Sequence, residues 1–109
     1  MKGVKYDAGK PRWSLLPWDV MDWVVRVLTV GAVKYSDDNW KKVPNAKDRY
    51  ESALMRHIRN HKKGIWLDEG EGGTNCPSLA NALVCLIFWF WLELKERKLT
   101  DDELHRLSQ

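Results

Sequence analysis

The feature that most constrains this chain is a nearly continuous apolar run at residues 79–92, Leu-Ala-Asn-Ala-Leu-Val-Cys-Leu-Ile-Phe-Trp-Phe-Trp-Leu. Its only polar side chain is Asn81, so a helix through the run has no face suited to water. Such a helix must be covered on all sides, either inside a bundle or by a second copy of the chain. A membrane span is disfavoured, because the run is several residues short of the roughly 20 required and Glu93, Lys95 and Glu96 follow at once.

The length and composition indicate a single domain, residues 1–109. Of its 109 residues 44% are hydrophobic and seven are tryptophan, enough for a small core. The net charge of +3 is too weak to indicate nucleic-acid binding, so we expect no nucleic-acid partner. Cys76 and Cys85 lack the spacing of a zinc site or a disulfide framework. The N-terminus carries no apolar signal segment, which predicts a cytoplasmic protein with no membrane partner.

Helical periodicity and capping residues predict an all-α bundle of about four helices, completed by oligomerisation. Residues 1–16 form an extended arm, with Trp13, Leu15 and Leu16 as anchors to the core, and the first helix begins near Pro17. A later helix contains the apolar run, and a short final helix begins with the capping box of Thr100 and Glu103.

The second helix is expected to begin with Asp48 as its N-cap, with Glu51 completing a capping box, and to end at Gly64. One inward stripe, at spacings of three and four residues, comprises Tyr50, Leu54, His57, Ile58 and His61. An inward histidine is more often a hydrogen-bonded core residue than a ligand.

Two groups of residues each allow a structural and a functional interpretation. Lys10 and Arg12 belong either to a solvated arm or to a phosphate-binding site, which their charge and donor geometry suit. Tyr35 and Trp40 are either core aromatics or platforms that stack on a base, with Lys34 supplying charge to a phosphate.

The loop at residues 65–77 places Asp68, Glu69 and Glu71 among glycines. Oxygen-rich loops of this kind suit Mg²⁺, which prefers one or two carboxylates together with substrate phosphates. The spacing does not match an EF-hand. Flexible acidic loops are also common as solvated segments, so this interpretation stays open.

Several of these segments, in the same order along the chain, resemble the phage-type dATP/dGTP diphosphohydrolase N-terminal domain family, a relative of the MazG-like all-α nucleotide pyrophosphohydrolases. The matching segments are Lys5-Tyr6-Asp7-Ala8-Gly9-Lys10-Pro11-Arg12, Gly31-Ala32-Val33-Lys34-Tyr35, Asn39-Trp40, Arg49-Tyr50, Ala53-Leu54 and Arg56-His57. The resemblance implies a phage protein with a MazG-like helical fold, a homodimer or homotetramer that binds nucleotides with Mg²⁺ bridging phosphates and acidic side chains.

The chain departs from the family pattern where catalysis would occur. Histidines commonly stand at the positions of Ser78 and Asn81, and a glutamate at that of Ile65. MazG-like enzymes also carry Glu-x-x-Glu on one helix and Glu-x-x-Asp on the next, whereas the second helix here offers only Glu51. Because a Mg²⁺-dependent hydrolase must polarise phosphate and position water, these departures shift weight towards binding without hydrolysis.

Three hypotheses follow. The first is a Mg²⁺-dependent diphosphohydrolase acting on a purine (d)NTP, with Asp68, Glu69 and Glu71 as metal ligands and Glu51 or His57 orienting water. The second is an inactive sponge that sequesters a nucleotide, including a cyclic immune signal, to counter host anti-phage defence. The third is a helical interaction module. The nucleotide-binding set expected under the first two comprises Lys10, Arg12, Lys34, Tyr35, Asn39, Trp40, Arg56 and Asn81.

Overall fold

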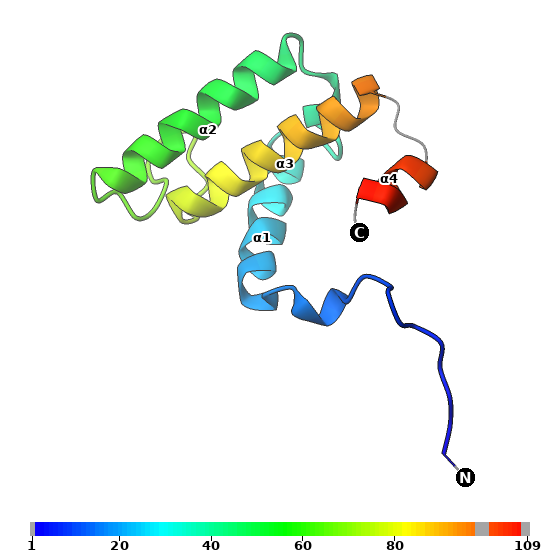
Figure 1. Ribbon diagram of the computed structural model, residues 1–109. Coiled ribbons are helices and arrows are strands. Elements are labelled where there is room, and N and C mark those ends of the chain that lie inside the picture. The colour runs from blue at the N-terminus through cyan, green and yellow to red at the C-terminus, as the bar shows by residue number, and fades with distance from the viewer. Residues whose placement is uncertain (1, 98–100, 108–109) are drawn as a thin grey trace.

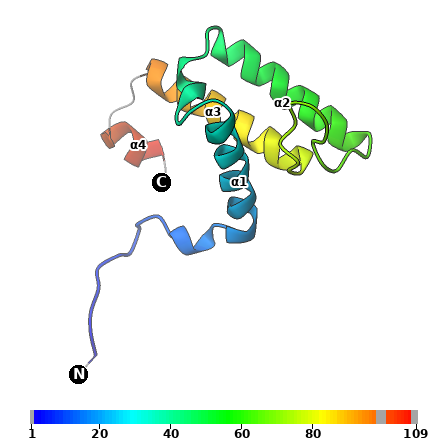
Figure 2. The same ribbon diagram turned by 180° about the vertical axis from the view of Figure 1, so that it is seen from behind.

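The helix that contains the apolar run is the element against which the others pack. The computed structural model describes residues 2–97 and 101–107. Within the bundle, α3 (Ser78–Arg97) lies beside α2 (Ala46–Lys62) and is crossed by α1 (Trp18–Lys34), as Figure 1 and, from behind, Figure 2 show. The other elements are the 3₁₀ helices η1 (Trp13–Leu15) and η2 (Asn39–Lys42) and the short α4 (Asp101–Leu107).

The predicted all-α fold with about four helices is confirmed. No strand occurs among the described residues, and a single isolated antiparallel bridge joins Leu67 to Pro77. The first helix begins one residue after Pro17, as expected. Thr100, the expected cap of the last helix, lies outside the described residues.

The core joins the middle of α1 to the first half of α3. Val24 and Val27 of α1 are buried against Ala80 and Val84 of α3, together with Cys76 from the preceding loop. Small side chains on α3 let the two helices approach closely. The inward stripe of α2 also lies where the periodicity predicted it, because all five of its residues are partly buried.

The start of α2 differs from the sequence prediction. Asn45, in the left-handed region with φ of 52°, is the N-cap, and no side-chain hydrogen bond caps the helix. Asp48 therefore lies inside the first turn, where the helix dipole favours a negative charge, and the predicted capping box with Glu51 is wrong. The end is as predicted: α2 stops at Lys62, and Gly64 has φ of +87°, which glycine adopts without strain.

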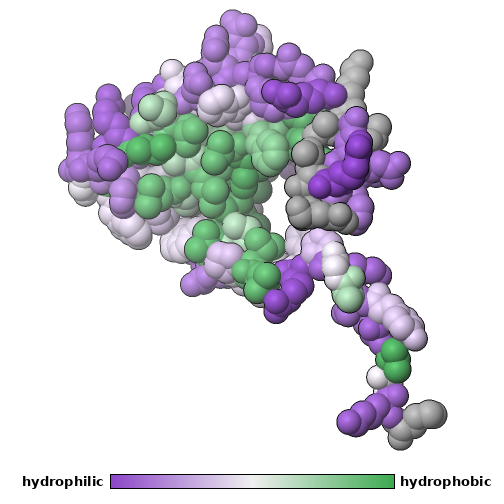
Figure 3. All heavy atoms as spheres, viewed as in Figure 1, coloured by the Kyte–Doolittle hydropathy of each residue, from purple (hydrophilic) through white to green (hydrophobic). Residues whose placement is uncertain are grey.

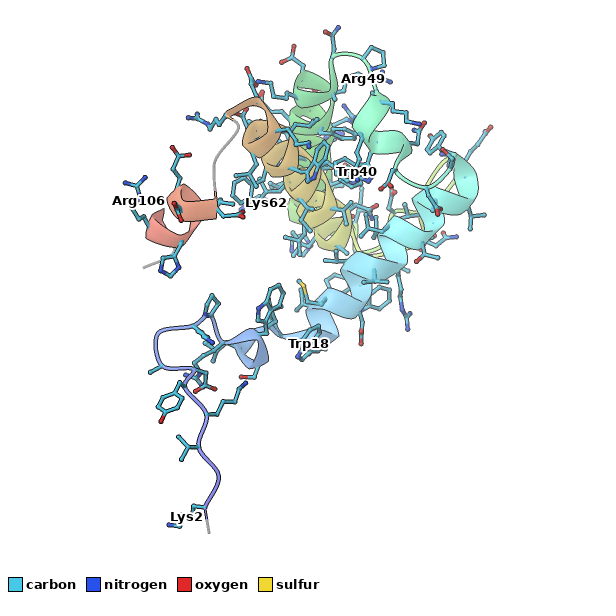
Figure 4. All side chains as sticks on the ribbon, turned by 90° about the vertical axis from the view of Figure 1, so that its right-hand side faces the viewer. Lys2, Trp18, Trp40, Arg49, Lys62 and Arg106 are labelled. Atoms are coloured by element: carbon cyan, nitrogen blue, oxygen red, sulfur yellow. The ribbon has the colours of Figure 1, made fainter. Side chains whose placement is uncertain are left out.

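The N-terminal arm extends away from the helices, with Lys2 near its far end (Figure 4). Trp13 and Leu15 are 72% and 68% exposed, so the prediction that they anchor the arm to the core is wrong; Leu16 alone of the three is half-buried. The radius of gyration of 17.2 Å exceeds the roughly 13 Å of a compact domain of about 100 residues. The arm is thus unsupported by the rest of the described chain.

Only part of α3 is covered. Leu79, Leu86, Ile87 and Phe90 are between 37% and 61% exposed, and their spacing places them on one side of the helix. Figure 3 shows this side as a continuous hydrophobic surface over α3 and α1, bordered by the hydrophilic surface of α2. The described residues of one chain therefore leave part of the apolar surface of α3 exposed to solvent.

By length and composition α3 could also cross a membrane. Its most apolar window has a mean hydropathy of 1.4, with 28% of that window buried in the molecule. The core helix of a soluble protein meets the same criterion. Here the polar Ser78 and Asn81 are buried within the bundle, as expected of a core helix.

Candidate functional site

A cavity of about 1240 Å³ opens between the end of α1, η2, α2 and α3. It is larger than the roughly 300–1,000 Å³ of most small-molecule sites. Five of the predicted nucleotide-binding residues border it, namely Tyr35, Asn39, Trp40, Arg56 and Asn81. The fold thus brings together residues from the connection after α1, from α2 and from α3.

Aromatic rings form one wall of the cavity. Trp40 stacks on Phe88 with ring centroids 4.3 Å apart, and the ring of Trp91 stands nearly perpendicular to Trp40 with centroids 4.9 Å apart. Tyr50 donates its hydroxyl proton to the Trp40 carbonyl at 3.3 Å, which ties η2 to α2. Phe88 covers one face of the Trp40 ring, and the Lys41 Nζ lies over that ring at 5.3 Å from its centroid, whereas Tyr35 is 63% exposed.

The cations predicted to hold phosphates are divided between the cavity and other parts of the chain. Arg56 borders the cavity together with Arg49, which the sequence analysis did not assign to the site. Lys34 lies just outside and donates to the Gly72 carbonyl at 3.2 Å, linking α1 to the acidic loop. Lys10 and Arg12 are exposed on the arm and are not brought to the cavity.

Asn81 and Ser78 hold the loop at residues 65–77 in place. The Asn81 amide accepts the Thr74 hydroxyl proton at 3.0 Å and donates to the carbonyls of Cys76 and Pro77 at 3.3 and 3.0 Å. Ser78, only 1% exposed, donates its hydroxyl to the Ile65 carbonyl at 2.8 Å. The polar groups at these two positions are therefore engaged with the loop, although Asn81 also borders the cavity.

The acidic side chains of this loop lie in different environments. Asp68 accepts the backbone N–H of Thr74 at 3.2 Å, while Glu69 and Glu71 are exposed. Within residues 2–97 and 101–107, no group of three or more His, Cys, Asp or Glu side chains could hold a metal ion. The Mg²⁺ site expected from the sequence needs only one or two of these carboxylates together with substrate phosphates, so it stays a prediction.

Neither residue predicted to orient water borders the cavity. Glu51 is exposed on α2. His57 is half-buried, its Nδ1 has no hydrogen-bond partner, and burial lowers its pKa below the ordinary value of 6.5, against a smaller opposing effect of Asp68. An inward, neutral imidazole is the result.

The sequence analysis missed several residues of the cavity. These include Arg49, Tyr50, Thr74, Cys85 and Phe88. Arg49 stands seven residues before Arg56, so the two lie on the same side of a helix, and this spacing could have identified Arg49. The position of Thr74 depends on how the loop folds, which the sequence pattern does not show. Burial raises the pKa of Cys85 to about 11, so its thiol is neutral at physiological pH.

Comparison with known proteins identifies the family. A sequence model described as dATP/dGTP diphosphohydrolase, N-terminal, matches residues 1–103. The chain belongs to this family. The dATP/dGTP diphosphohydrolase of Salmonella phage PMBT28 is 33% identical over 102 residues, which are 94% of this chain and 33% of that protein. This member of the dATP/dGTP diphosphohydrolase N-terminal family thus spans about a third of the length of that relative. No solved structure matches the chain.

Proposed function

We propose that this domain binds a purine nucleotide in the cavity and, by itself, does not hydrolyse it. The observation that supports binding without hydrolysis is the engagement of Ser78 and Asn81 with the loop. At these two positions the family resemblance leads one to expect histidines. Family membership and a relative named for dATP and dGTP support a purine nucleotide as the ligand.

The proposed binding mode uses the aromatic and cationic residues of the cavity. The base stacks on the exposed ring of Tyr35 beside Trp40, and the phosphates lie against Arg56 and Arg49. Stacking on aromatic rings and charge-assisted hydrogen bonds from guanidinium groups require no metal ion. Affinity is therefore expected to persist in a chelator.

Sequestration is the function that follows from such a site. A phage domain that holds a purine nucleotide, linear or cyclic, in the host cytoplasm lowers its free concentration by mass action. The role would be that of a sponge, for a nucleotide pool or for an immune signal.

Hydrolysis of a purine (d)NTP is the second candidate function. Two observations favour it: the relative named as a diphosphohydrolase, and the unpartnered Nδ1 of His57, which leaves a buried acceptor near Asp68. This reaction would require Mg²⁺, which one or two carboxylates of the loop would hold together with the substrate phosphates.

A second copy of the chain is the proposed partner for the uncovered side of α3. The exposed Leu79, Leu86 and Phe90 form a face that can pack against itself about a two-fold axis. Such pairing gives the apolar helix the cover it otherwise lacks.

Titration with dATP and dGTP in EDTA tests the proposal. We expect both to bind the purified protein, Arg56→Ala to weaken binding about tenfold or more, and Asp68→Ala to leave affinity unchanged within about twofold. Arg26→Ala removes an exposed arginine of α1 outside the cavity and serves as the control. Binding that appears only with Mg²⁺ and is lost in Asp68→Ala would support hydrolysis instead.

A further inference from the structure

A row of cations, which we call the cationic row, runs along α2 to its C-cap: Arg49, Arg56, Arg59 and Lys63. Arg49, Arg56 and Lys63 are spaced by seven residues and so share one side of the helix, with Arg59 beside them. All four are exposed, and none forms an ion pair with a carboxylate in the described part of the chain. The side-chain hydrogen bonds of these four residues are limited to two: Arg49 donates to the Pro44 carbonyl, and Arg59 donates to the Asn60 side chain.

The row begins in the cavity and continues beyond it. Arg49 and Arg56 border the cavity, whereas Arg59 and Lys63 do not. Asp48 and Glu51 flank Arg49, and Asp48 also borders the cavity, whereas residues 52–67 include no acidic residue, so the part of the row beyond Glu51 has no carboxylate beside it in the sequence.

Local helix physics does not account for all of these charges. The helix dipole favours Lys63 at the C-terminal end, but its influence is confined to the last turn. Arg49 and Arg56 stand further back, and like charges on neighbouring turns of one face repel each other. An anionic ligand that follows the row removes this repulsion.

The dimensions indicate a ligand longer than one nucleotide. Fourteen residues separate Arg49 from Lys63, which at 1.5 Å per residue is about 21 Å along the helix axis. The phosphates of a single nucleotide with its base in the cavity reach only the first part of this row. The cavity of about 1240 Å³ also exceeds the usual volume of a small-molecule site.

We propose that the ligand is a short single-stranded oligonucleotide, with its terminal purine in the cavity and its phosphodiester backbone along the cationic row. The inference rests on the proposed nucleotide site and extends it. A single strand is required because a base must leave its stack to enter a cavity. The expectation of no nucleic-acid partner came from the net charge alone, which averages this row with acidic residues elsewhere in the chain.

Three probes test the inference in EDTA: dATP, a 5′-phosphorylated linear tetradeoxyadenylate, and cyclic di-adenosine monophosphate. The row variant Arg59→Ala/Lys63→Ala leaves the cavity residues intact. Its control, Arg26→Ala/Lys95→Ala, removes the same two charges from exposed positions on α1 and α3.

We expect the linear tetranucleotide to bind the wild-type protein about tenfold more tightly than dATP. In the row variant this advantage disappears. The slope of log affinity against log salt concentration for the tetranucleotide becomes shallower by about 1.4, because each of the two lost phosphate contacts contributes about 0.7. The affinity for dATP and for the cyclic dinucleotide is expected to stay unchanged, and the control to keep the wild-type pattern.

Two results would overturn the inference while the proposed function stands. One is dATP binding with no gain for the tetranucleotide, and the other is tighter binding of the cyclic dinucleotide than of the linear strand. An equal loss in the row variant and the control would also overturn it, because the charges would then act without regard to position. Failure of all three probes to bind would overturn the proposed function as well.

Discussion

Ser78 donates its hydroxyl proton to the carbonyl of Ile65 across 2.8 Å, so the first residue of α3 is joined to the first residue of the loop before it. The Ser78 backbone N–H adds a bond to the Trp66 carbonyl, also at 2.8 Å. These contacts close the loop at its base, and Asn81 fixes it at Thr74, the loop residue that borders the cavity. The shape of the cavity wall thus depends on two buried polar side chains.

Ser78→Ala removes a buried hydroxyl and leaves the Ile65 carbonyl without its donor. We expect a loss of about 1–3 kcal/mol in the free energy of unfolding, measured by chemical denaturation. Ser14→Ala, in the exposed η1, should change it by no more than about 0.5 kcal/mol. Equal stability of the two variants would mean that the Ser78 hydroxyl does not fasten the loop.

His57 should make stability depend on pH. Burial lowers its pKa in the folded state, so below the ordinary value of 6.5 the unfolded chain binds a proton that the folded protein resists. The contribution of His57 to the free energy of unfolding is fully present above pH 6.5. It is lost as the pH falls from 6.5 through the lower pKa that His57 has in the folded protein. Denaturation between pH 8 and 5 should show a smaller loss of stability for His57→Gln than for wild type. Identical slopes for wild type and His57→Gln would contradict the burial of this imidazole.

Cys85 should resist thiol reagents in the folded protein. With its pKa raised to about 11 from 9.0, its thiolate fraction at pH 8 is about a hundredfold lower than in the unfolded chain. Labelling of a Cys76→Ala variant should therefore be slow until denaturant is added. Because Cys85 borders the cavity, a bound purine nucleotide should slow the reaction further. Labelling at the same rate with and without bound nucleotide would locate the ligand elsewhere.

The exposed side of α3 predicts an oligomer that a single charge can disrupt. Phe90, 61% exposed, is expected to be central to the contact, so Phe90→Lys should lower the mass measured by light scattering to that of the monomer. Met55→Lys places the same charge at an equally exposed site on α2 and should leave the mass unchanged. A monomeric wild-type protein would refute the proposed pairing.

Periodicity and helix-ending residues were enough to predict the helices. The apolar run marked α3, Pro17 the start of α1 and Gly64 the end of α2, because each depends on interactions within a few residues. The cap of α2 was misplaced because Asn45 adopts the left-handed conformation and begins the helix earlier than the capping-box pattern implied.

The site was less accessible to such reasoning, because its residues are brought together by packing between helices. Tyr35, Arg56 and Asn81 were selected individually, but their common border on one cavity follows from the packing of α2 and η2 against α3. The interpretation of the acidic loop as a metal site could not anticipate that Asp68 accepts the Thr74 N–H while the neighbouring glutamates stay exposed.

The most direct test of the account is to incubate the purified protein with Mg²⁺ and a panel of purine nucleotides, including cyclic forms. The protein is then denatured by heat and the released nucleotide is analysed by chromatography. Binding without hydrolysis predicts that a purine nucleotide is depleted from solution and reappears intact after denaturation. Recovery of its monophosphate with pyrophosphate would contradict the account and identify an enzyme.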